Sequence, residues 1–352
     1  MLCIDARMLY ASGIGTFLKN LIPFFDKKKT ILLIRNQDLQ LAPRGYPIIL
    51  CTSSIYSVKE QIELPFKIPT CDLFWSPHYN IPILPVAAKH RVVTIHDVAH
   101  LAFKNSQTCL QNRYARFMLK QAVKKSDFIT TDSLFSQKEI ARYLSVNPQQ
   151  IQVIAAGIDC KRFKATSQTL KTFTDKYKLP EEFLLFVGNL KPHKNLKLLV
   201  ECYRENTSLP PLVVVGKREG LLTIDPVLKQ VTAEKIRFVG QVEDNEIPLF
   251  YQTASLFVFP SCYEGFGLPP LEAMASGCPV IASCSASIPE VCGDAAVLLP
   301  PSTPHLWVQK IMEVMKDRTL REELIAKGFK QVEKYRWEQT AATYQELFLR
   351  LS

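Results

Sequence analysis

Short apolar runs alternate with amphipathic segments along the whole chain. The apolar runs are rich in Val, Ile, Leu and Phe, which is typical of strands buried on both faces of a sheet. The expected strands are residues 2–4, 30–34, 48–51, 73–75, 92–95, 128–131 and 152–154, and then 183–187, 212–215, 236–239, 256–259 and 279–282. The expected helices are residues 15–25, 110–124, 136–143, 196–204 and 268–275, with a helical end over 303–351. This alternation predicts an α/β fold with parallel sheets.

Chain length and a restart of the pattern favour two domains. The chain has 352 residues, which exceeds a typical single domain. A polar segment, Asp159–Lys178, lacks a strand pattern and is the expected linker, and the strand–helix alternation starts again at Phe183. We therefore expect one domain over residues 1–165 and a second over residues 166–336.

Polar residues mark several expected helix starts. Ser136 and Glu139 have the spacing of a capping box. Asp225-Pro226 and Thr303-Pro304 each place a capping residue before a proline at the first helical position. These pairs predict helices that begin near residues 136, 226 and 304.

Cysteine usage and hydropathy bear on the compartment. The chain has ten cysteines, none in a C-x-x-C pair, and several lie in apolar strand patterns. This favours reduced, buried thiols in a cytoplasmic protein over a disulfide framework or a zinc site. The start, Met1–Asp5, predicts a first strand rather than a signal peptide, and no apolar run is long enough to span a membrane.

The charge balance favours anionic partners. The net charge is +10, and basic residues gather at Lys27–Lys29 and over Arg113–Lys125. The second cluster lies on an amphipathic helix pattern, which is compatible with peripheral contact with anionic lipid at the inner face of the membrane or with an ordinary solvated helix face. No nucleic-acid-binding motif is present.

Two glutamates flank a glycine-rich turn in the second half of the chain. Glu264 follows the strand at 256–259, and Glu272 lies eight residues later in the expected helix. Gly265 and Gly267 let backbone N–H groups approach a ligand, and the helix start favours a diphosphate. Carboxylates accept hydrogen bonds from the hydroxyl groups of a ribose or hexose. The alternative is an ordinary strand–turn–helix unit with solvated glutamates.

Three further groups follow strands, where ligands bind in open α/β sheets. Gly13 and Gly15 open the first helix, although the third glycine of a dinucleotide fingerprint is absent. Lys194 lies at a turn before a helix and suits a diphosphate. His96-Asp97 ends the strand at 92–95, with His78 and His100 as weaker candidates. Plain turns, a solvated lysine and a structural histidine are the alternatives.

The segment from Glu264 to Val280 closely resembles the E-x7-E region of glycosyltransferase family 4, whose members are retaining enzymes with the GT-B fold. The resemblance implies that Glu264 contacts the donor sugar and that Glu272 holds the nucleotide ribose. It also implies that the sugar and diphosphate face the backbone amides of Gly265, Phe266, Gly267 and Leu268.

The resemblance extends to the other motifs. It implies that Gly13 and Gly15 cover the donor phosphates, that His96 and Asp97 face the donor sugar or acceptor, and that Val239 lies near the base. Lys194 then neutralises the leaving phosphate. Asn189 stands where the family usually has an arginine, which leaves the second cation unassigned between Lys217 and Arg218. The resemblance also implies a helix over 337–352 that returns to the first domain.

These likenesses imply a GT-B enzyme with two Rossmann-like domains, of which the first binds acceptor and the second binds a nucleotide sugar. The expected reaction moves a hexose to a hydroxyl of a surface glycan or lipid-linked saccharide, with catalytic groups His96, Asp97, Lys194 and Glu264. GDP-mannose is the expected donor, with UDP-glucose or a nucleotide deoxysugar left open. No metal is expected, because Lys194 and backbone amides supply the positive charge.

Two other functions remain open at this stage. One is an inactive GT-B protein that binds a nucleotide or glycan without turnover. The other is a nucleotide-sugar epimerase on the same fold. The chain is too short for a glycogen-phosphorylase-like enzyme.

Overall fold

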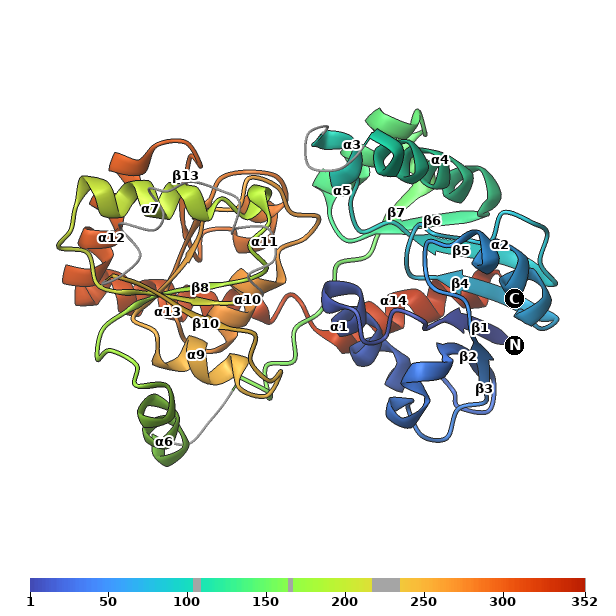
Figure 1. Cartoon of the computed structure of the whole chain (residues 1–352), viewed down its shortest axis with the longest axis horizontal. Coiled ribbons are helices and arrows are strands. Elements are labelled where there is room, and N and C mark those ends of the chain that lie inside the picture. The colour runs from blue at the N-terminus through green and yellow to red at the C-terminus, as the bar shows by residue number, and fades with distance from the viewer. Residues whose placement is uncertain (104–108, 164–166, 217–234, 352) are drawn as a thin grey trace. The chain divides into compact units, whose positions relative to one another are not determined.

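The computed structural model describes residues 1–103, 109–163, 167–216 and 235–351, and divides the chain into two compact units (Figure 1). Unit 1 comprises Met1–Gly157 and Trp337–Ser352, and unit 2 comprises Ile158–Arg336. The first boundary lies eight residues before the expected one at residue 165. Each unit holds one parallel sheet of its own.

Unit 1 is built on a seven-stranded parallel sheet in the order β3-β2-β1-β4-β5-β6-β7. The strands are β1 Leu2–Asp5, β2 Thr30–Arg35, β3 Ile48–Cys51, β4 Cys71–Ser76, β5 Ala88–Thr94, β6 Phe128–Thr131 and β7 Ile151–Val153. The chain moves from β1 toward β3 and then reverses to reach β4. The carboxyl ends of β1 and β4 therefore form the point at which an open sheet accommodates ligands.

Helices cover both faces of this sheet. They are α1 Ser12–Leu21, α2 Val58–Lys67, α3 Ala99–Ala102, α4 Cys109–Lys125, α5 Leu134–Leu144 and α14 Trp337–Arg350, with 3-10 turns at Ile22–Phe24, Asn36–Leu41 and Pro148–Gln150. Because crossovers are right-handed, the reversal places α2, α4 and α5 on one face and α1 on the other. The C-terminal helix α14 packs beside α1 (Figure 1).

Unit 2 contains a six-stranded parallel sheet in the order β10-β9-β8-β11-β12-β13. The strands are β8 Leu184–Val187, β9 Leu212–Val215, β10 Ile236–Gly240, β11 Leu256–Phe259, β12 Val280–Ser283 and β13 Val297–Leu299. The helices are α6 Ser167–Tyr177, α7 Leu196–Glu205, α9 Ile247–Thr253, α10 Leu268–Ala275, α11 Ile288–Cys292, α12 Pro304–Lys316 and α13 Arg318–Val332, with a 3-10 turn at Pro192–Lys194.

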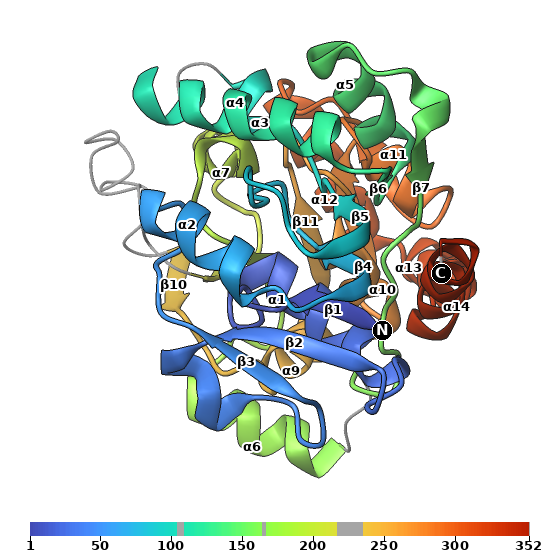
Figure 2. The same ribbon diagram turned by 90° about the vertical axis from the view of Figure 1, so that its right-hand side faces the viewer.

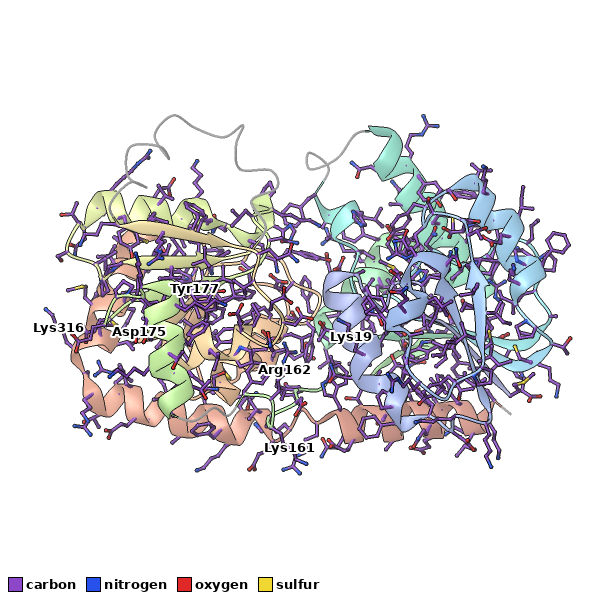
Figure 3. All side chains as sticks on the ribbon, turned by 60° about the horizontal axis from the view of Figure 1, so that its bottom comes forward. Lys19, Lys161, Arg162, Asp175, Tyr177 and Lys316 are labelled. Atoms are coloured by element: carbon purple, nitrogen blue, oxygen red, sulfur yellow. The ribbon has the colours of Figure 1, made fainter. Side chains whose placement is uncertain are left out.

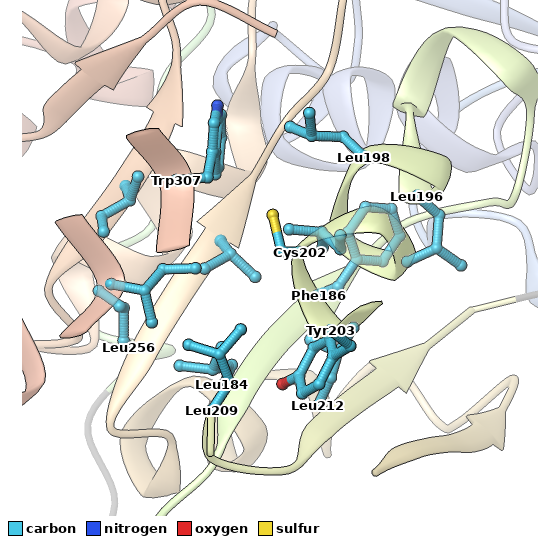
Figure 4. Close-up of a cluster of buried hydrophobic side chains, with 14 of the residues drawn as sticks. Leu184, Phe186, Leu196, Leu198, Cys202, Tyr203, Leu209, Leu212, Leu256 and Trp307 are labelled. Carbon is cyan, nitrogen blue, oxygen red and sulfur yellow. The ribbon is translucent and has the colours of Figure 1, made fainter. Parts of the chain in front are cut away.

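The core of unit 2 lies between the sheet and helices α7 and α12 (Figure 4). Leu184 and Phe186 of β8 are fully buried against Cys202 of α7 and Trp307 of α12. The Trp307 indole satisfies its own N–H by donating to the Pro300 carbonyl at 2.8 Å. This rigid layer fixes β8 and β11, whose carboxyl ends carry the candidate site.

The structure corrects several expectations and confirms others. Helix α6 lies within Asp159–Lys178, so that segment is not a linker. Helix α5 begins after Ser133, whose side chain accepts a hydrogen bond from the Ser136 N–H. The N-cap residue is therefore Ser133 and not Ser136. Helix α10 begins at Leu268 and ends at Ala275 as predicted. Lys217, Arg218 and Asp225-Pro226 lie outside the described residues.

The structure tests part of what the sequence predicts about the cysteines and about membrane-spanning helices. The nine described cysteines are all free. Among the described residues, no helix combines the length and hydropathy needed to cross a bilayer.

Candidate active site

The candidate site of unit 2 lies where its sheet reverses direction. Strands β8 and β11 are neighbours, but the chain leaves β8 toward β9 and leaves β11 toward β12. The segments that follow their carboxyl ends therefore diverge and leave room for a ligand. Lys194 lies on the first segment and Glu264 on the second.

Lys194 and Glu264 contact each other directly. The Lys194 Nζ donates to Glu264 Oε1 at 2.6 Å, and the two side chains are only 13% and 12% exposed. The ammonium group also lies 5.4 Å from the centre of the Phe259 ring. Partial desolvation strengthens this ion pair, because water screens it less than a surface pair. The pair therefore offers an ammonium group to an anion and, beside it, a carboxylate to the hydroxyl groups of a polyol.

Buried serines hold the turn that carries Glu264. Ser261 Oγ donates to Glu264 Oε1 at 2.5 Å. Ser287 Oγ contacts the carbonyls of Glu264 at 2.9 Å and Phe266 at 2.6 Å. Both serines are fully buried. Neither serine could be identified from the sequence, since a serine in a turn carries no distinctive spacing.

The turn ends at Gly267, which has φ = +111°. A Cβ added at this position would lie 2.9 Å from Ile288 Cδ1. A glycine is required here for the backbone conformation, since a φ in this range strains any residue with a Cβ, whereas the end of the Ile288 side chain can shift. Helix α10 then begins with Leu268-Pro269-Pro270. Two of its first three residues lack an N–H group, so the backbone donors here come from the turn and Leu268 more than from the helix start.

Glu272 lies in the second turn of α10 and accepts a hydrogen bond from Tyr251 Oη at 3.0 Å. Burial raises the pKa of the Glu272 carboxyl, while the Tyr251 hydroxyl and the nearby Arg162 oppose that rise. Arg162, labelled in Figure 3, also donates to the Asp244 carbonyl. Tyr251 and Arg162 are thus the partners of Glu272 that sequence spacing did not reveal.

Asn189 and Val239 lie at the carboxyl ends of β8 and β10. Asn189 follows β8, and its Oδ1 is buried without a hydrogen-bond partner among the described residues. Such an orphaned acceptor favours a ligand that donates to it. Val239 lies at a bulge in β10, where the pairing with β9 shifts between Phe238 and Gly240. Bulges commonly re-aim side chains beside functional sites.

In unit 1, the His96 ring follows β5 and is fixed at both nitrogens. Its Nδ1 lies 2.5 Å from Asp132 Oδ2, and its Nε2 lies 3.1 Å from the Pro77 carbonyl. Both partners offer acceptor oxygens, so the two contacts favour an imidazolium ring that donates from both nitrogens. Burial lowers the pKa of His96, but the Asp132 carboxylate more than offsets this and raises it.

The other predicted residues of unit 1 lie near His96. The Phe17 ring of α1 contacts His96 edge-on, with centroids 5.0 Å apart. Gly13 and Gly15 lie in the first turn of α1, and the Gly15 N–H donates to Ala11 O at 2.9 Å. A Cβ on Gly15 would approach Leu9 O to 2.6 Å, so close backbone packing requires this glycine. Asp97 Oδ1 accepts from Ala99 N–H at 2.9 Å.

A buried charged cluster fills the reversal point of unit 1. Arg7 donates twice to Asp5, at 2.8 and 2.7 Å, and its Nη1 lies 3.6 Å from Glu60 Oε2. His78 Nε2 lies 3.1 Å from Asp5 Oδ2. All four side chains are at most 1% exposed, and Arg7 and His78 hold the pKa of Asp5 far below its usual range despite burial. Of these four residues, only His78 was a candidate from the sequence.

Similarity to known proteins identifies the family. Residues 169–331 match the family described as glycosyl transferases group 1. The chain is 31% identical over 265 residues to O-antigen chain mannosyltransferase B of Escherichia coli, covering 72% of this chain and 69% of that protein. The chain belongs to the group 1 glycosyltransferases. O-antigen chain mannosyltransferase RfbU of Salmonella typhimurium is 28% identical over 262 residues, covering 74% and 69% of the two chains.

The fold of this glycosyltransferase agrees with that family. The structure of sucrose-phosphate synthase from Thermosynechococcus elongatus superimposes with a TM-score of 0.78 at 18% identity, covering 99% of this chain and 98% of the other. The two parallel sheets with their helices form a GT-B fold. The mannosyltransferase relatives and the family match make the chain a hexosyltransferase, and neither the inactive binding protein nor the epimerase is favoured.

Within this glycosyltransferase, the structure groups the predicted site residues by unit. It brings Lys194 and Glu264 into direct contact and places Gly265, Phe266, Gly267 and Glu272 on the same turn and helix. His96, Asp97 and the start of α1 form a second group in unit 1.

Proposed function

We propose that this enzyme transfers a mannosyl group from GDP-mannose to a hydroxyl of a surface glycan or lipid-linked saccharide, with retention of configuration. The observation that carries the proposal is the Lys194–Glu264 pair at the point where the sheet of unit 2 reverses. The names of the relatives, both O-antigen chain mannosyltransferases, support the sugar and the acceptor class.

Unit 2 would hold the donor. When the donor binds, Lys194 leaves Glu264 and pairs with the diphosphate. Glu264 then becomes available to accept hydrogen bonds from the sugar hydroxyls. Glu272 accepts from the ribose hydroxyls, and the turn amides from Gly265 to Leu268 bind the diphosphate. Asn189 follows β8 and Val239 lies near the end of β10, with β9 between these two strands. In this proposal Asn189 Oδ1 accepts from the donor and Val239 contacts the base.

Unit 1 would hold the acceptor at the carboxyl edge of its sheet. The Tyr79 ring contacts the rings of Tyr56 and His100, at centroid distances of 6.1 and 5.8 Å. Saccharides stack their apolar faces on such rings, and the nearby Asp97 carboxylate can accept from acceptor hydroxyls. His96 supplies a fixed positive charge at the same edge, and the start of α1, at Gly13 and Gly15, lies beside it.

The chemistry that we propose needs no protein nucleophile. The bond between the sugar C1 and the donor phosphate oxygen breaks, and the acceptor oxygen bonds to C1 on the same face. The acceptor proton passes to the departing phosphate oxygen, so the nucleoside diphosphate leaves as one product. Lys194 and the turn amides stabilise the charge that develops on the leaving group, and no metal is required in this proposal.

We also place the enzyme in the cytoplasm, with peripheral contact between the basic helix α4 and anionic lipid. Helix α4 carries five Lys or Arg residues and no acidic residue. The acceptor class fits such contact, since lipid-linked saccharides are held at a membrane.

The test is a donor panel with the purified protein. We expect GDP and GDP-mannose to raise the melting temperature, and GDP release from GDP-mannose to depend on a lipid-linked saccharide acceptor. Glu272→Ala and Lys194→Ala should abolish both effects. Stabilisation by UDP and UDP-glucose instead would retain the site and overturn the donor, and stabilisation by none would overturn the proposed function.

A further inference from the structure

The Glu264 carboxylate has two side-chain donors, and both lie on the same oxygen. Lys194 Nζ contacts Oε1 at 2.6 Å, and Ser261 Oγ contacts the same Oε1 at 2.5 Å. Among the described residues, no side chain donates to Oε2. Oε2 is therefore the oxygen that can accept from a sugar hydroxyl, provided that Oε1 stays held.

The segment that joins β11 to α10 (Figure 2) carries Ser261, which is fully buried. Its Oγ also lies 3.2 Å from the His193 carbonyl and 3.3 Å from the Tyr263 carbonyl. A serine hydroxyl has one proton to donate. The contact with Glu264 is the shortest of the three, and hydrogen bonds to an ionised acceptor are stronger than those to a carbonyl. The proton of Ser261 therefore belongs to the carboxylate.

The backbone on both sides of the ion pair is tied together. The Cys262 N–H donates to the His193 carbonyl at 2.7 Å, and Asn195 Nδ2 donates to the Pro260 carbonyl at 3.2 Å. These two bonds join the turn that ends at Lys194 to the segment that follows β11. Lys194 can therefore change its partner by rotation of its side chain, while both turns stay in place.

We propose that Ser261 is a positioning residue, which keeps the Glu264 carboxylate in place when Lys194 moves to the donor diphosphate. Ser261 then remains the donor to Oε1, and Oε2 faces the sugar hydroxyls. This inference rests on the proposed function, because it takes the roles of Lys194 and Glu264 from there. It adds a residue that acts on the sugar transfer step and leaves nucleotide binding unchanged.

The test compares Ser261→Ala with wild type, using GDP-mannose and a lipid-linked saccharide acceptor. We expect kcat for GDP release to fall about 10- to 100-fold, the effect of losing one hydrogen bond to a charged group. GDP itself should bind as it does to wild type, because it carries no sugar for Glu264 to contact. Ser261→Cys keeps a similar volume with a weaker donor, so its kcat should lie between the two.

Ser255→Ala is the matched control. Ser255 precedes β11 at the opposite end of the strand, and its Oγ accepts from the Phe183 N–H at 3.2 Å. Its kcat should equal that of wild type. Melting temperatures of all variants separate a loss of folded protein from a loss of rate.

A double-mutant cycle with Glu264→Gln shows whether Ser261 acts through the carboxylate. If it does, Ser261→Ala should change kcat little in the Glu264→Gln background, and the two substitutions should be coupled by about tenfold or more. A serine that only stabilises the fold would lower kcat by the same factor in both backgrounds. If Ser261→Ala does not fold, Ser261→Cys takes its place in the cycle.

Three outcomes would overturn the inference. The first is a wild-type kcat in Ser261→Ala. The second is a cycle in which the two substitutions act independently. The third is loss of GDP binding by a folded Ser261→Ala, which would assign Ser261 to the diphosphate site. A wild-type protein that releases no GDP from GDP-mannose would overturn the proposed function and this inference with it, so the two failures are distinguishable.

Discussion

At the scale of single residues, the Lys194–Glu264 pair determines how the donor site responds to a diphosphate. Lys194 can pair with Glu264 or with a phosphate, so the carboxylate competes with the ligand for the same ammonium group. Glu264 therefore opposes diphosphate binding and assists sugar binding. These opposite effects separate the two roles experimentally.

We expect Glu264→Gln to bind GDP at least as tightly as wild type but to lose about 10²- to 10³-fold in kcat, because the amide releases Lys194 and cannot replace the charge near the sugar. Lys194→Met should lose both GDP binding and turnover. Calorimetric titration and initial rates measure the two effects. Glu313→Gln breaks a surface pair with Lys310 on α12 and serves as control. Weaker GDP binding by Glu264→Gln would contradict the competition.

The raised pKa of Glu272 predicts how nucleotide binding depends on pH. The charged carboxylate is the form that accepts from two ribose hydroxyls. GDP affinity should therefore fall as pH drops through the pKa of Glu272. Tyr251→Phe removes a hydrogen bond that favours the charged form, so the pKa rises further and the decline starts at higher pH.

Titration calorimetry at several pH values measures the pH at which GDP affinity declines. Tyr203→Phe is the matched control, since Tyr203 is also buried and donates to a carbonyl, Pro210 O, away from the site. If the decline in GDP affinity occurred at the same pH in Tyr251→Phe and wild type, Glu272 would not be the titrating group.

The His96–Asp132 contact predicts a pH-dependent stability. The pKa of His96 is raised in the folded chain, so the stabilisation is fully present below the unfolded pKa of about 6.5 and is lost as pH rises through the folded pKa. Asp132→Asn should therefore destabilise most at mildly acidic pH and least at alkaline pH. Urea unfolding across this range measures the difference. A cost that grows with pH would contradict the imidazolium form.

At the scale of elements, α14 completes the core of unit 1. Its Tyr344 is fully buried, its ring lies 4.8 Å from that of Trp75, and its hydroxyl contacts Thr94 Oγ1 at 3.2 Å and Thr130 Oγ1 at 3.1 Å. Helix α14 thus lies across strands that are more than 200 residues earlier in the chain.

We expect Tyr344→Phe to cost about 1 kcal/mol of unfolding free energy, because the two threonine hydroxyls still bond to each other at 2.8 Å. Tyr344→Ala should cost about 3–5 kcal/mol through the cavity that it leaves. Leu349→Ala, at an exposed position of the same helix, should stay within about 0.5 kcal/mol. Chemical denaturation measures all three. Equal costs for Tyr344→Ala and Leu349→Ala would contradict the packing role.

The elements also show which features the sequence could predict. Apolar strand runs and the helix from Leu268 to Ala275 were predictable because burial and glycine punctuation leave a local signature. Helix α6 was missed because its segment is polar and its helix is stabilised by packing, including Phe173 against Phe250 of α9. β13 was missed because three residues carry too short a pattern.

The same distinction applies to the site. Lys194, Glu264 and His96 could be named from their places after strands. Their partners could not, because Ser287 and Asp132 lie 23 and 36 residues from the groups they hold. The cluster around Arg7 was missed for a related reason, since Glu60 and His78 reach Arg7 and Asp5 only in the folded unit.

At the scale of the whole molecule, the chain has two units with separate sheets and cores, and the proposed roles divide between them. A ligand that binds only the folded form of one unit should stabilise that unit by mass action, by about 2.7 kcal/mol at a hundredfold excess over Kd. We therefore expect scanning calorimetry to show two transitions. GDP should raise the one that belongs to unit 2, and Tyr344→Ala should lower the one that belongs to unit 1. Lys194→Met should remove the response to GDP and leave the unit 1 transition unchanged. If GDP instead raised the transition that Tyr344→Ala lowers, with no other transition moving, unit 1 would be the donor unit.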